Sequence, residues 1–473
     1  MDRKVLHRMT VPIVAGCFLL ADCTPSTTTT PGPTTAFAVT RFTDAGALDT
    51  TFAAGRGVAI TDINPALFDF AVAIAVQPDN KIIAAGSSGF AGAGIIALVR
   101  HNAADGTLDT GFGTGGIVTT PTPTGWTSAS ATTVAVQPAD SKIVVAAVVF
   151  NGPSGSTTGS TGIVLLRYNT DGKLDTGFGT GASGLATPLP IGSGFPGDTC
   201  GLVLQPDGKP VVVGASSDGK IVLARYTIAG ILDTTFGDAS SPGITTTNLN
   251  TLAGDSDIGL SPSIGLQSGG QIIVASVAGK SFGPPADHVV LRYGTNGALD
   301  TTFGGVTGGI VTTDVAGGGN VDFPNALAVQ ANDKIVVAGH ANVDVNTGVS
   351  DISLVRYNAD GSLDTSFVGL AGNPNPAGIV TTNLGGFDGV FSIALQAQPP
   401  NEPKSLVSGN VSSGAFPKLA VLRYNKDGTP DTTFDANGVA TAPLVGPSNI
   451  SSGNAVALQA VGLGVAVVVA GYD

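Results

Sequence analysis

The stretch VRYNADGSLDTSF, residues 355–367, decides how the whole chain is organised. Viewed alone, it resembles a calcium-binding loop, because Asn358, Asp360 and Asp364 offer oxygen ligands around a glycine turn. The stretch is, however, one of seven copies, whose aspartates are Asp49, Asp109, Asp175, Asp233, Asp300, Asp364 and Asp431. Successive copies are 58–67 residues apart. The chain is therefore an array of repeats, and the repeat has to be understood before a site is assigned.

Four features are constant in all seven copies. Each Asp is followed by Thr, has a Gly three residues before it and has a Phe three residues after it. An Arg also precedes each Asp, and the seven are Arg41, Arg100, Arg167, Arg225, Arg292, Arg356 and Arg423. The phenylalanines are Phe52, Phe112, Phe178, Phe236, Phe303, Phe367 and Phe434.

The remainder of each unit is a series of short β-branched runs separated by turns. A run of the type Gly-Ile-Val-Thr-Thr (116–120, 309–313, 378–382) is followed by a variable loop and then by Ala-Leu-Ala-Val-Gln. A tight turn leads to a run such as 334–339, and a second variable loop leads to the strand that ends in Arg-Tyr. Such runs predict strands and hairpins. Four strands per unit predict an all-β fold, a seven-bladed β-propeller of four-stranded blades.

The two ends of the array complement each other. The last repeat stops at residues 465–471 without a fourth strand, and residues 37–42 form a fourth strand without the preceding three. We therefore predict that the N-terminal strand (37–42) completes the C-terminal blade, closes the ring and removes an exposed sheet edge.

These residues are similar to the delta-60 repeat, a β-propeller family of secreted and surface-attached bacterial proteins of largely unknown function. The resemblance rests on the Arg-Tyr-Asn-x-Asp-Gly-x-Leu-Asp-Thr-x-Phe motif, on Gly-Ile-Val-Thr-Thr and on Ala-Val-Gln-Pro-Asp-Gly-Lys, and it spans residues 37–473. It implies a propeller and an exported location. It implies no activity, because a fold does not specify a function.

Comparison among the copies weighs against calcium in the repeated motif. The position of Asp360 is Ala45, Ala229 or Asn296 in three copies, whereas the Arg, Gly, Asp and Phe never change. We interpret the motif as a structural staple in which Arg and Asp pair across a turn, as in Arg167–Asp175, Arg292–Asp300, Arg356–Asp364 and Arg423–Asp431. Calcium remains an alternative only for the copies at 167–178, 356–367 and 423–434; no other cofactor is predicted.

The charge balance restricts the class of partner. The net charge is −13, and seven of the ten arginines occupy the repeated position. No basic patch remains for phosphates, so we exclude nucleic acid as a partner.

The N-terminus has the pattern of a targeting segment. A charged region at residues 2–8 precedes the apolar run 11–21, which is too short to span a bilayer as a helix. Leu19-Leu20-Ala21-Asp22-Cys23 resembles a lipoprotein signal, with Asp22 as a departure and Cys17 as the alternative cysteine. We predict a signal peptide at 1–23, a Pro/Thr-rich tether at 24–36 and the propeller at 37–473. The protein is then exported and either lipid-anchored through Cys23 or secreted.

The variable loops are the place where we expect function. Strands alternate in direction, so the invariant turns share one face and the variable loops share the other, where binding residues usually lie. The candidate binding residues are Trp126, Asp314, Asn320, Asp322, Asp388, His288 and His340.

We expect a monomeric, non-enzymatic propeller that binds an extracellular protein or glycan through this face, with no membrane contact other than the lipid. The runner-up is a glycan hydrolase or lyase that uses Asp residues near the central channel; clustering of the Asp and His candidates would favour it. A third alternative is a purely structural surface module, with or without bound calcium. No catalytic residue can be assigned from the sequence.

Overall fold

The structure is a computed structural model. It describes residues 35–472 except 90–93, 154–158, 182, 194–199, 217, 250–261, 280–285, 306–307, 318–319, 345–348, 374, 399–400, 413–416, 443–451 and 463. The predicted signal peptide with Cys23, and the predicted tether up to residue 34, lie outside the described residues. None of the residues within the described ranges forms a helix with the length and apolarity needed to cross a membrane.

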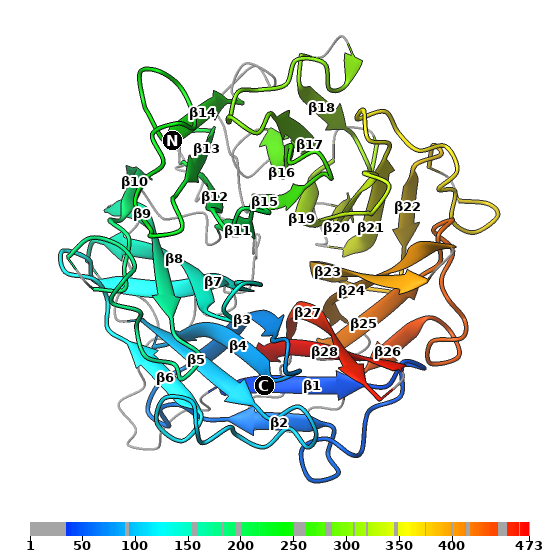
Figure 1. Cartoon of the computed structure of the whole chain (residues 1–473). Helices are drawn as coiled ribbons and strands as arrows, with labels where there is room; N and C mark the ends of the chain where they lie inside the picture. Colours follow the sequence, from blue (N-terminus) through cyan, green and yellow to red (C-terminus); the bar gives the residue numbers. More distant parts are fainter. Residues whose placement is uncertain are drawn as a thin grey trace, which may run out of the picture.

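Within the described residues, twenty-eight strands form seven four-stranded antiparallel sheets arranged in a ring (Figure 1). The inner strands, which contact one another around the axis, are β3 (Asp69–Val76), β7 (Ser128–Val136), β11 (Gly201–Leu204), β15 (Ser263–Leu266), β19 (Asp322–Val329), β23 (Gly389–Gln398) and β27 (Ser452–Val461). The second strands are β4 (Ile82–Ser88), β8 (Ile143–Asn151), β12 (Pro210–Ala215), β16 (Ile272–Gly279), β20 (Ile335–Asp344), β24 (Asn401–Val411) and β28 (Gly464–Tyr472).

The third and fourth strands complete each blade. The third strands are β5 (Ile95–His101), β9 (Ser160–Tyr168), β13 (Lys220–Arg225), β17 (Ala286–Tyr293), β21 (Val349–Tyr357), β25 (Lys418–Tyr424) and β1 (Phe37–Phe42). The outer strands are β6 (Ile117–Thr120), β10 (Leu189–Ser193), β14 (Ile244–Asn248), β18 (Ile310–Thr313), β22 (Ile379–Thr382), β26 (Val439–Thr441) and β2 (Val58–Thr61). Buried apolar side chains from adjacent blades pack against each other to form the cores. The predicted seven-bladed propeller is confirmed.

The ring is closed by strands from both ends of the chain. The closing sheet has the order β2-β1-β28-β27, so β1 pairs with β28 as predicted, with Phe37 opposite Tyr472. Strand β2 joins the same sheet, which means that the N-terminus contributes two strands. Residues 37–42 are thus the third strand of this blade and not the predicted fourth. The Gly-Ile-Val-Thr-Thr strand, predicted to belong to the blade that follows, does not join that blade. It pairs instead with the Arg-Tyr strand before it, because the short connection between them folds the chain back onto the same sheet.

A sevenfold contact joins each blade to the next and uses the constant residues of the repeat. Arg356 donates from Nε to Asp364 at 2.6 Å and from Nη1 to the carbonyl of Lys426, in the next blade, at 2.5 Å. Its guanidinium carbon lies 4.7 Å from the ring centre of Phe367. That ring packs against the left-handed Gly428 of the next blade, where a Cβ would lie 3.0 Å from a ring carbon. We call this contact the blade latch.

The geometry of the latch is the same at every junction. The Arg Nε–Asp distances are 2.6–2.9 Å, and the bonds from Arg Nη1 to the next blade are 2.5–2.8 Å. The last latch runs from Arg423 to the carbonyl of Asp44 and therefore crosses the closing junction. The constant residues thus hold neighbouring blades together, which explains their repetition.

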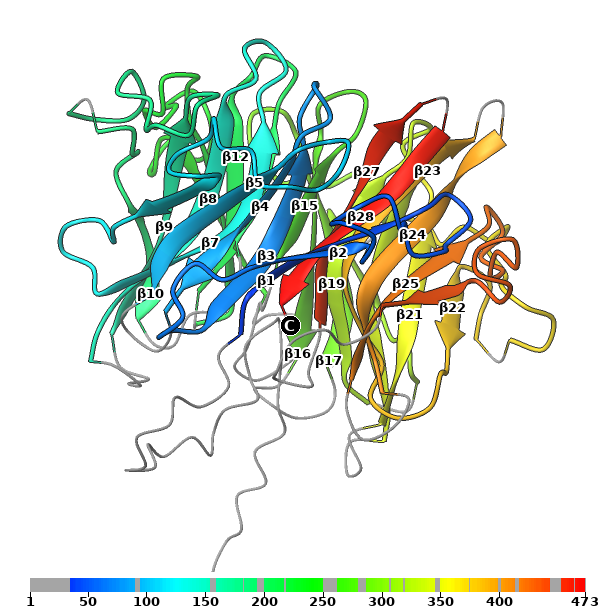
Figure 2. The same ribbon diagram turned by 90° about the horizontal axis from the view of Figure 1, so that it is seen from below.

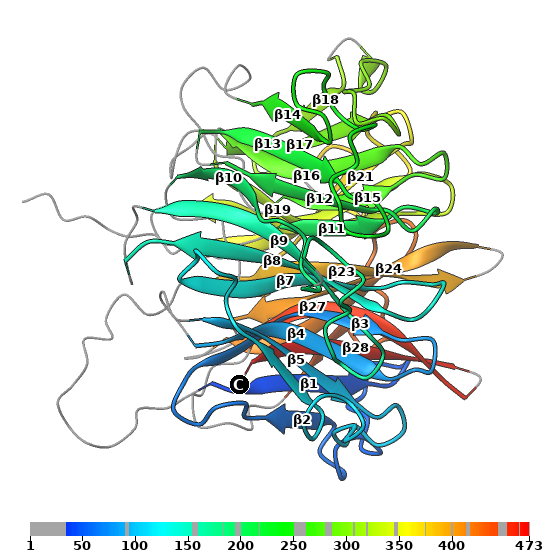
Figure 3. The same cartoon turned by 60° about the vertical axis from the view of Figure 1, so that its left-hand side comes forward.

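The two faces of the ring differ as the strand directions require. On one face, which we call the latch face, Lys81, Lys142, Lys209, Lys334 and Lys404 reach from the first hairpin of a blade to its latch Asp, at 2.7–3.0 Å. The opposite face, here the variable-loop face, carries the loops between blades and between second and third strands. In Figure 2, β27 and β28 meet at the upper, latch face, and the C-terminal end lies at the lower face. Figure 3 shows the strands running between the two faces.

Candidate functional site

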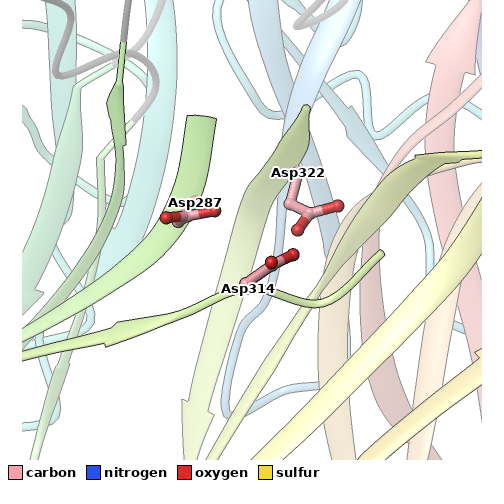
Figure 4. Close-up of side chains that lie close together, drawn as sticks. All are labelled: Asp287, Asp314 and Asp322. Atoms are coloured by element: carbon pink, nitrogen blue, oxygen red, sulfur yellow. The ribbon is translucent and has the colours of Figure 1, made fainter. Parts of the chain in front are cut away.

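Three carboxylates from two blades come together on the variable-loop face. Asp287 lies on β17, Asp314 directly follows β18, and Asp322 begins β19 of the next blade (Figure 4). One oxygen from each lies within 4.8 Å of the others. Asp314 is exposed, Asp287 is half-buried and Asp322 is fully buried. Among the described residues, this is the one group of acidic side chains whose spacing suits a metal ion. We call it the carboxylate triad.

The buried member of the triad holds the loop that connects the two blades. Asp322 accepts hydrogen bonds from the backbone N–H groups of Val315, at 2.7 Å, and Ala316, at 3.1 Å. Burial raises the pKa of Asp322 to about 7; these two N–H groups oppose the rise, and the charges of Asp314 and Asp287 add to it. Near neutral pH the carboxyl group of Asp322 is therefore partly protonated.

Two other blades use an aspartate in the same way. Asp69 and Asp388 lie eight residues before Gln77 and Gln396, as Asp322 lies eight residues before Gln330. Asp69 accepts from the N–H of Ile63 at 2.7 Å, and Asp388 accepts from the N–H of Leu384 at 2.8 Å. All three side chains are fully buried, and burial raises the pKa of each. We call Asp69, Asp322 and Asp388 the loop caps.

In the neighbouring blade, a hydrogen-bond donor takes the place of the exposed carboxylate of the triad. There, Asp351, Asn383 and Asp388 occupy the positions that correspond to Asp287, Asp314 and Asp322. Asn383 donates from Nδ2 to Asp351 at 2.8 Å. The exposed position thus supplies a donor in one blade and a third carboxylate in the other. The triad could hold a divalent cation with carboxylate oxygens, although a calcium ion needs six to eight oxygen ligands.

The two candidate histidines lie close to this region but are not accessible. His288 is fully buried, and neither ring nitrogen has a hydrogen-bond partner among the described residues. The ring of His340 lies between Phe323 and Phe387, with centres 5.0 and 5.7 Å away, and its Nδ1 is 3.2 Å from Nδ2 of Asn325. Burial lowers the pKa of His288 to about 3, with His340 adding to the effect, and that of His340 to about 4. Both are neutral at physiological pH and are positioned as core residues.

Trp126 and Asn320 have local structural contacts. The indole of Trp126 packs over Gly162 of β9, where a Cβ would lie 2.8 Å from the ring. Its side chain also contacts the core between the blades of β3 and β7. Asn320 donates to the carbonyl of Gly317 and accepts, through its own carbonyl, from the N–H of Ala286. Neither residue joins the carboxylate triad.

The weak metal candidates in the repeated motif are engaged by protein donors. Asp360 accepts from the N–H and the hydroxyl of Ser362 at 3.0 and 2.7 Å. Asp364 is bonded to Arg356 and lies 3.0 Å from Nζ of Lys334. Asn358 donates to Ser362. These contacts leave little room for a cation at Asp364, where two positive charges already lie.

Asp314 and Asp322 were predicted from the sequence as candidate binding residues, whereas Asp287 and Asp69 were not. Asp69 could have been found, because it has the same spacing to the repeated Gln as Asp322 and Asp388. Asp287 gives a weaker signal, since the position five residues before the repeated Arg is Asp only in Asp287 and Asp351. Asp388 was predicted, and it lies in the next blade rather than in the triad.

The fold and the latch define a β-propeller built from tandem repeats. Five segments match a family model described as "Domain of unknown function (DUF5122) beta-propeller", at residues 77–112, 139–178, 267–303, 330–367 and 405–434. The chain is thus similar to a propeller repeat family, and the more specific delta-60 assignment stays a prediction. All five segments end at the latch Phe, and the loops between blades lie outside them.

The other comparisons add no function. The search of curated proteins finds no match. Solved structures that are similar include a protein of unknown function from Dyadobacter fermentans DSM 18053, with 11% identity over 72% of this chain and 93% of that one and a TM-score of 0.38. A GH43 endo-arabinanase from Bacillus licheniformis has 16% identity over 61% and 94% and a TM-score of 0.30. The polysaccharide lyase Uly1 has 12% identity over 85% and 90% and a TM-score of 0.40. Likeness at this level transfers no activity to the chain.

Proposed function

We propose that this protein is an exported, non-enzymatic propeller that is anchored through Cys23 and binds an extracellular protein or glycan with its variable-loop face. The observation that carries the proposal is the set of loop caps. Loops whose sequences differ from blade to blade are held by fully buried aspartates that accept their backbone N–H groups. A loop ordered in this way loses less conformational entropy on binding, which favours affinity.

The latch face supports the proposal by contrast. Its repeated Arg, Asp and Phe side chains are already used in contacts between blades. The variable-loop face instead presents a different set of side chains above each blade, which is the usual arrangement of a binding surface on a rigid scaffold.

Binding to glycan and protein arrays tests the proposal. The chain from residue 24 onward is compared with Asp388→Ala, which releases the loop at residues 383–388, and with Lys173→Ala. Lys173 is a matched control because its side chain is 82% exposed on the latch face. We expect a ligand whose binding is weakened by Asp388→Ala and unchanged by Lys173→Ala. Binding that depends on Lys173 and not on Asp388 would contradict the proposal.

The runner-up, a glycan hydrolase or lyase, draws on one specific observation. The triad places Asp322, whose pKa burial raises to about 7, close to the exposed Asp314, and a pair of neighbouring carboxyl groups is the apparatus of glycosidase acid–base catalysis. The fully buried position of Asp322 keeps a sugar from reaching it, so we rank this function second. Release of reducing ends or unsaturated products from polysaccharides, abolished by Asp314→Ala, would reverse that order.

A further inference from the structure

The chain contains three asparagines that are directly followed by glycine, at Asn151-Gly152, Asn296-Gly297 and Asn437-Gly438. At such a step the backbone nitrogen of the glycine can attack the side-chain carbonyl carbon of the asparagine, because glycine has no Cβ to hinder the approach. A bond forms between this nitrogen and the carbonyl carbon, the bond from that carbon to the amide nitrogen breaks, and ammonia leaves. Water then opens the cyclic imide to aspartate or isoaspartate. All three steps therefore carry the chemistry for deamidation.

The local contacts of each Asn-Gly step decide whether it can react in the folded protein. The glycine nitrogen has to give up its proton and approach the asparagine side chain, and that side chain has to turn toward it. Hydrogen bonds that hold either group must break first, and their loss adds to the activation free energy. A step whose groups are firmly bonded is therefore protected.

The step at Asn296 is held by bonds to both reacting groups. The N–H of Gly297 donates to the carbonyl of Gly294 at 2.9 Å. The side-chain oxygen of Asn296 accepts from the N–H of Ala298 at 3.1 Å. Gly297 is also buried in a blade latch, where a Cβ would lie 2.6 Å from the ring of Phe236 in the preceding blade. Closing the imide here would break two bonds and displace a latch glycine.

The step at Asn437 is held in the same way. The N–H of Gly438 donates to the carbonyl of Phe434 at 2.7 Å. The side-chain oxygen of Asn437 accepts from the N–H of Val439 at 3.0 Å. Gly438 is buried, and a Cβ there would lie 3.1 Å from the Cβ of Pro430. Both Asn-Gly steps of the latch face are therefore protected by the fold.

The step at Asn151 lies on the variable-loop face and is held more weakly. Asn151 is the last residue of β8 and is exposed, and Gly152 is half-buried. The described bond of the Gly152 N–H goes to the hydroxyl of Thr127 at 3.3 Å, which is longer than the corresponding bonds of the other two glycines. A long bond to an exposed hydroxyl is easily replaced by a bond to water. The fold thus protects this step least.

We infer that Asn151 is a deamidation site of the folded protein, whereas Asn296 and Asn437 are protected. The reaction places a carboxylate on the variable-loop face. The isoaspartate product also lengthens the backbone by one carbon directly before Gly152, which shifts the glycine whose N–H and carbonyl contact Thr127. Thr127 follows Trp126 in the chain, so the modification reaches the loop that carries the tryptophan. The inference stands whether or not the proposed partner-binding function does.

Peptide mass spectrometry of the purified folded chain, sampled over several weeks at mildly alkaline pH, tests the inference. We expect deamidation at residue 151 to be at least about tenfold faster than at residues 296 and 437, because two ordinary hydrogen bonds must break at each of the latter. The chain unfolded in guanidinium is the matched control. There the three steps should react at similar rates, because the contacts that protect two of them are absent.

The variant Asn151→Gln identifies the modified residue by charge. Anion-exchange chromatography of the aged wild type should show a more acidic species, and this species should be missing from the aged variant. Similar rates at the three steps of the folded protein would overturn the inference. It would also be overturned if Asn151 stayed intact in the folded protein over the time in which the unfolded chain is fully deamidated.

Discussion

The latch face and the variable-loop face use aspartate in opposite ways. On the latch face, Asp364 meets the positive charges of Arg356 and Lys334. Burial alone would raise its pKa, but bonds from Ser366, from Lys334 and from Arg356 hold the pKa well below its usual range. On the variable-loop face, Asp322 accepts only backbone N–H groups among its described hydrogen bonds and faces two further carboxylates. In the latch the carboxylate is paired with cations, whereas the triad gathers three carboxyl groups for which no ion pair is described, and a cationic ligand could neutralise them.

Removing a latch carboxylate should have the largest effect on stability. Asp364→Ala removes the nearer counter-ion of Arg356, which is 1% exposed and keeps only Glu402, at 3.4 Å from Nη1. Breaking a buried pair in this way costs about 3–5 kcal/mol, so we expect a clearly lower midpoint in guanidinium unfolding. Asp360→Ala, in the same turn, removes only hydrogen bonds to Ser362 and should cost about 1 kcal/mol. Equal losses would show that the latch is not what holds the blades together.

The pH dependence of stability should separate the two faces. The folded pKa of Asp322 is raised to about 7, so its contribution to stability is fully present below its unfolded pKa and is lost as pH rises through 7. At about 1.4 kcal/mol per pKa unit, this loss is at most about 4 kcal/mol. The depressed pKa of Asp364 acts in the opposite direction, since its contribution is present above the unfolded pKa and is lost as pH falls below it.

The variant Asp322→Asn cannot ionise and checks the first half of this contrast. We expect the melting temperature of the wild type to fall between pH 5 and pH 8, and the fall to be smaller in Asp322→Asn. A wild-type melting temperature that is flat over this range would show that Asp322 titrates normally. Acid unfolding below pH 4 should be alike in both proteins, because it reports on the latches.

Two glycines with the same backbone conformation separate the cost of overpacking at the latch from the cost of backbone strain. Gly361 and Gly372 have φ values of +91° and +90°. A Cβ at Gly361 would lie 2.8 Å from the ring of Phe303 in the preceding blade, whereas nothing lies within 4 Å at Gly372. Gly372→Ala should therefore cost about 1 kcal/mol from the left-handed backbone alone. Gly361→Ala should cost about 2–3 kcal/mol, because overpacking is added. Similar unfolding midpoints for the two variants would mean that the phenyl ring of Phe303 moves aside at little cost in free energy.

The smallest expected effect is a gain in stability. Asp314→Asn converts the triad to the Asp-Asn-Asp arrangement of the neighbouring blade, in which Asn383 donates to Asp351. Relief of like-charge repulsion and one new hydrogen bond should stabilise the protein at pH 8 by about 0.5–1 kcal/mol. Calorimetry with calcium and with chelator extends the test. Any effect of calcium on the melting temperature of the wild type should disappear in Asp314→Asn. An effect that persists in this variant would indicate that calcium binds instead at the repeated turns, including Asp360.

The fold could be predicted from the sequence because the motif that forms the latch occurs in it seven times. Each junction between two blades uses the same Arg, Asp, Phe and left-handed Gly, so the same motif occurs in every repeat. The carboxylate triad was only partly predictable. Its members come from a third strand, from the end of an outer strand and from the inner strand of the next blade, and only the register and the loop between blades bring them together. The pairing of β2 was missed because the strand motif does not specify which neighbouring sheet it joins.

The closing blade has a consequence for how the protein is made. Of the described strands, β1 and β2 are synthesised first. Because β1 pairs with β28, the pairing of Phe37 with Tyr472 can form only after β28 has been synthesised. Until then β1 can pair with β2 but lacks its other partner, β28, and unpaired strand edges are prone to aggregation. If the chain crosses a membrane from its N-terminus, the ring cannot close before the last strand has emerged. Strand β28 would then have crossed before the protein becomes a closed propeller, and a product that lacks β28 would be recognisable by its open edge.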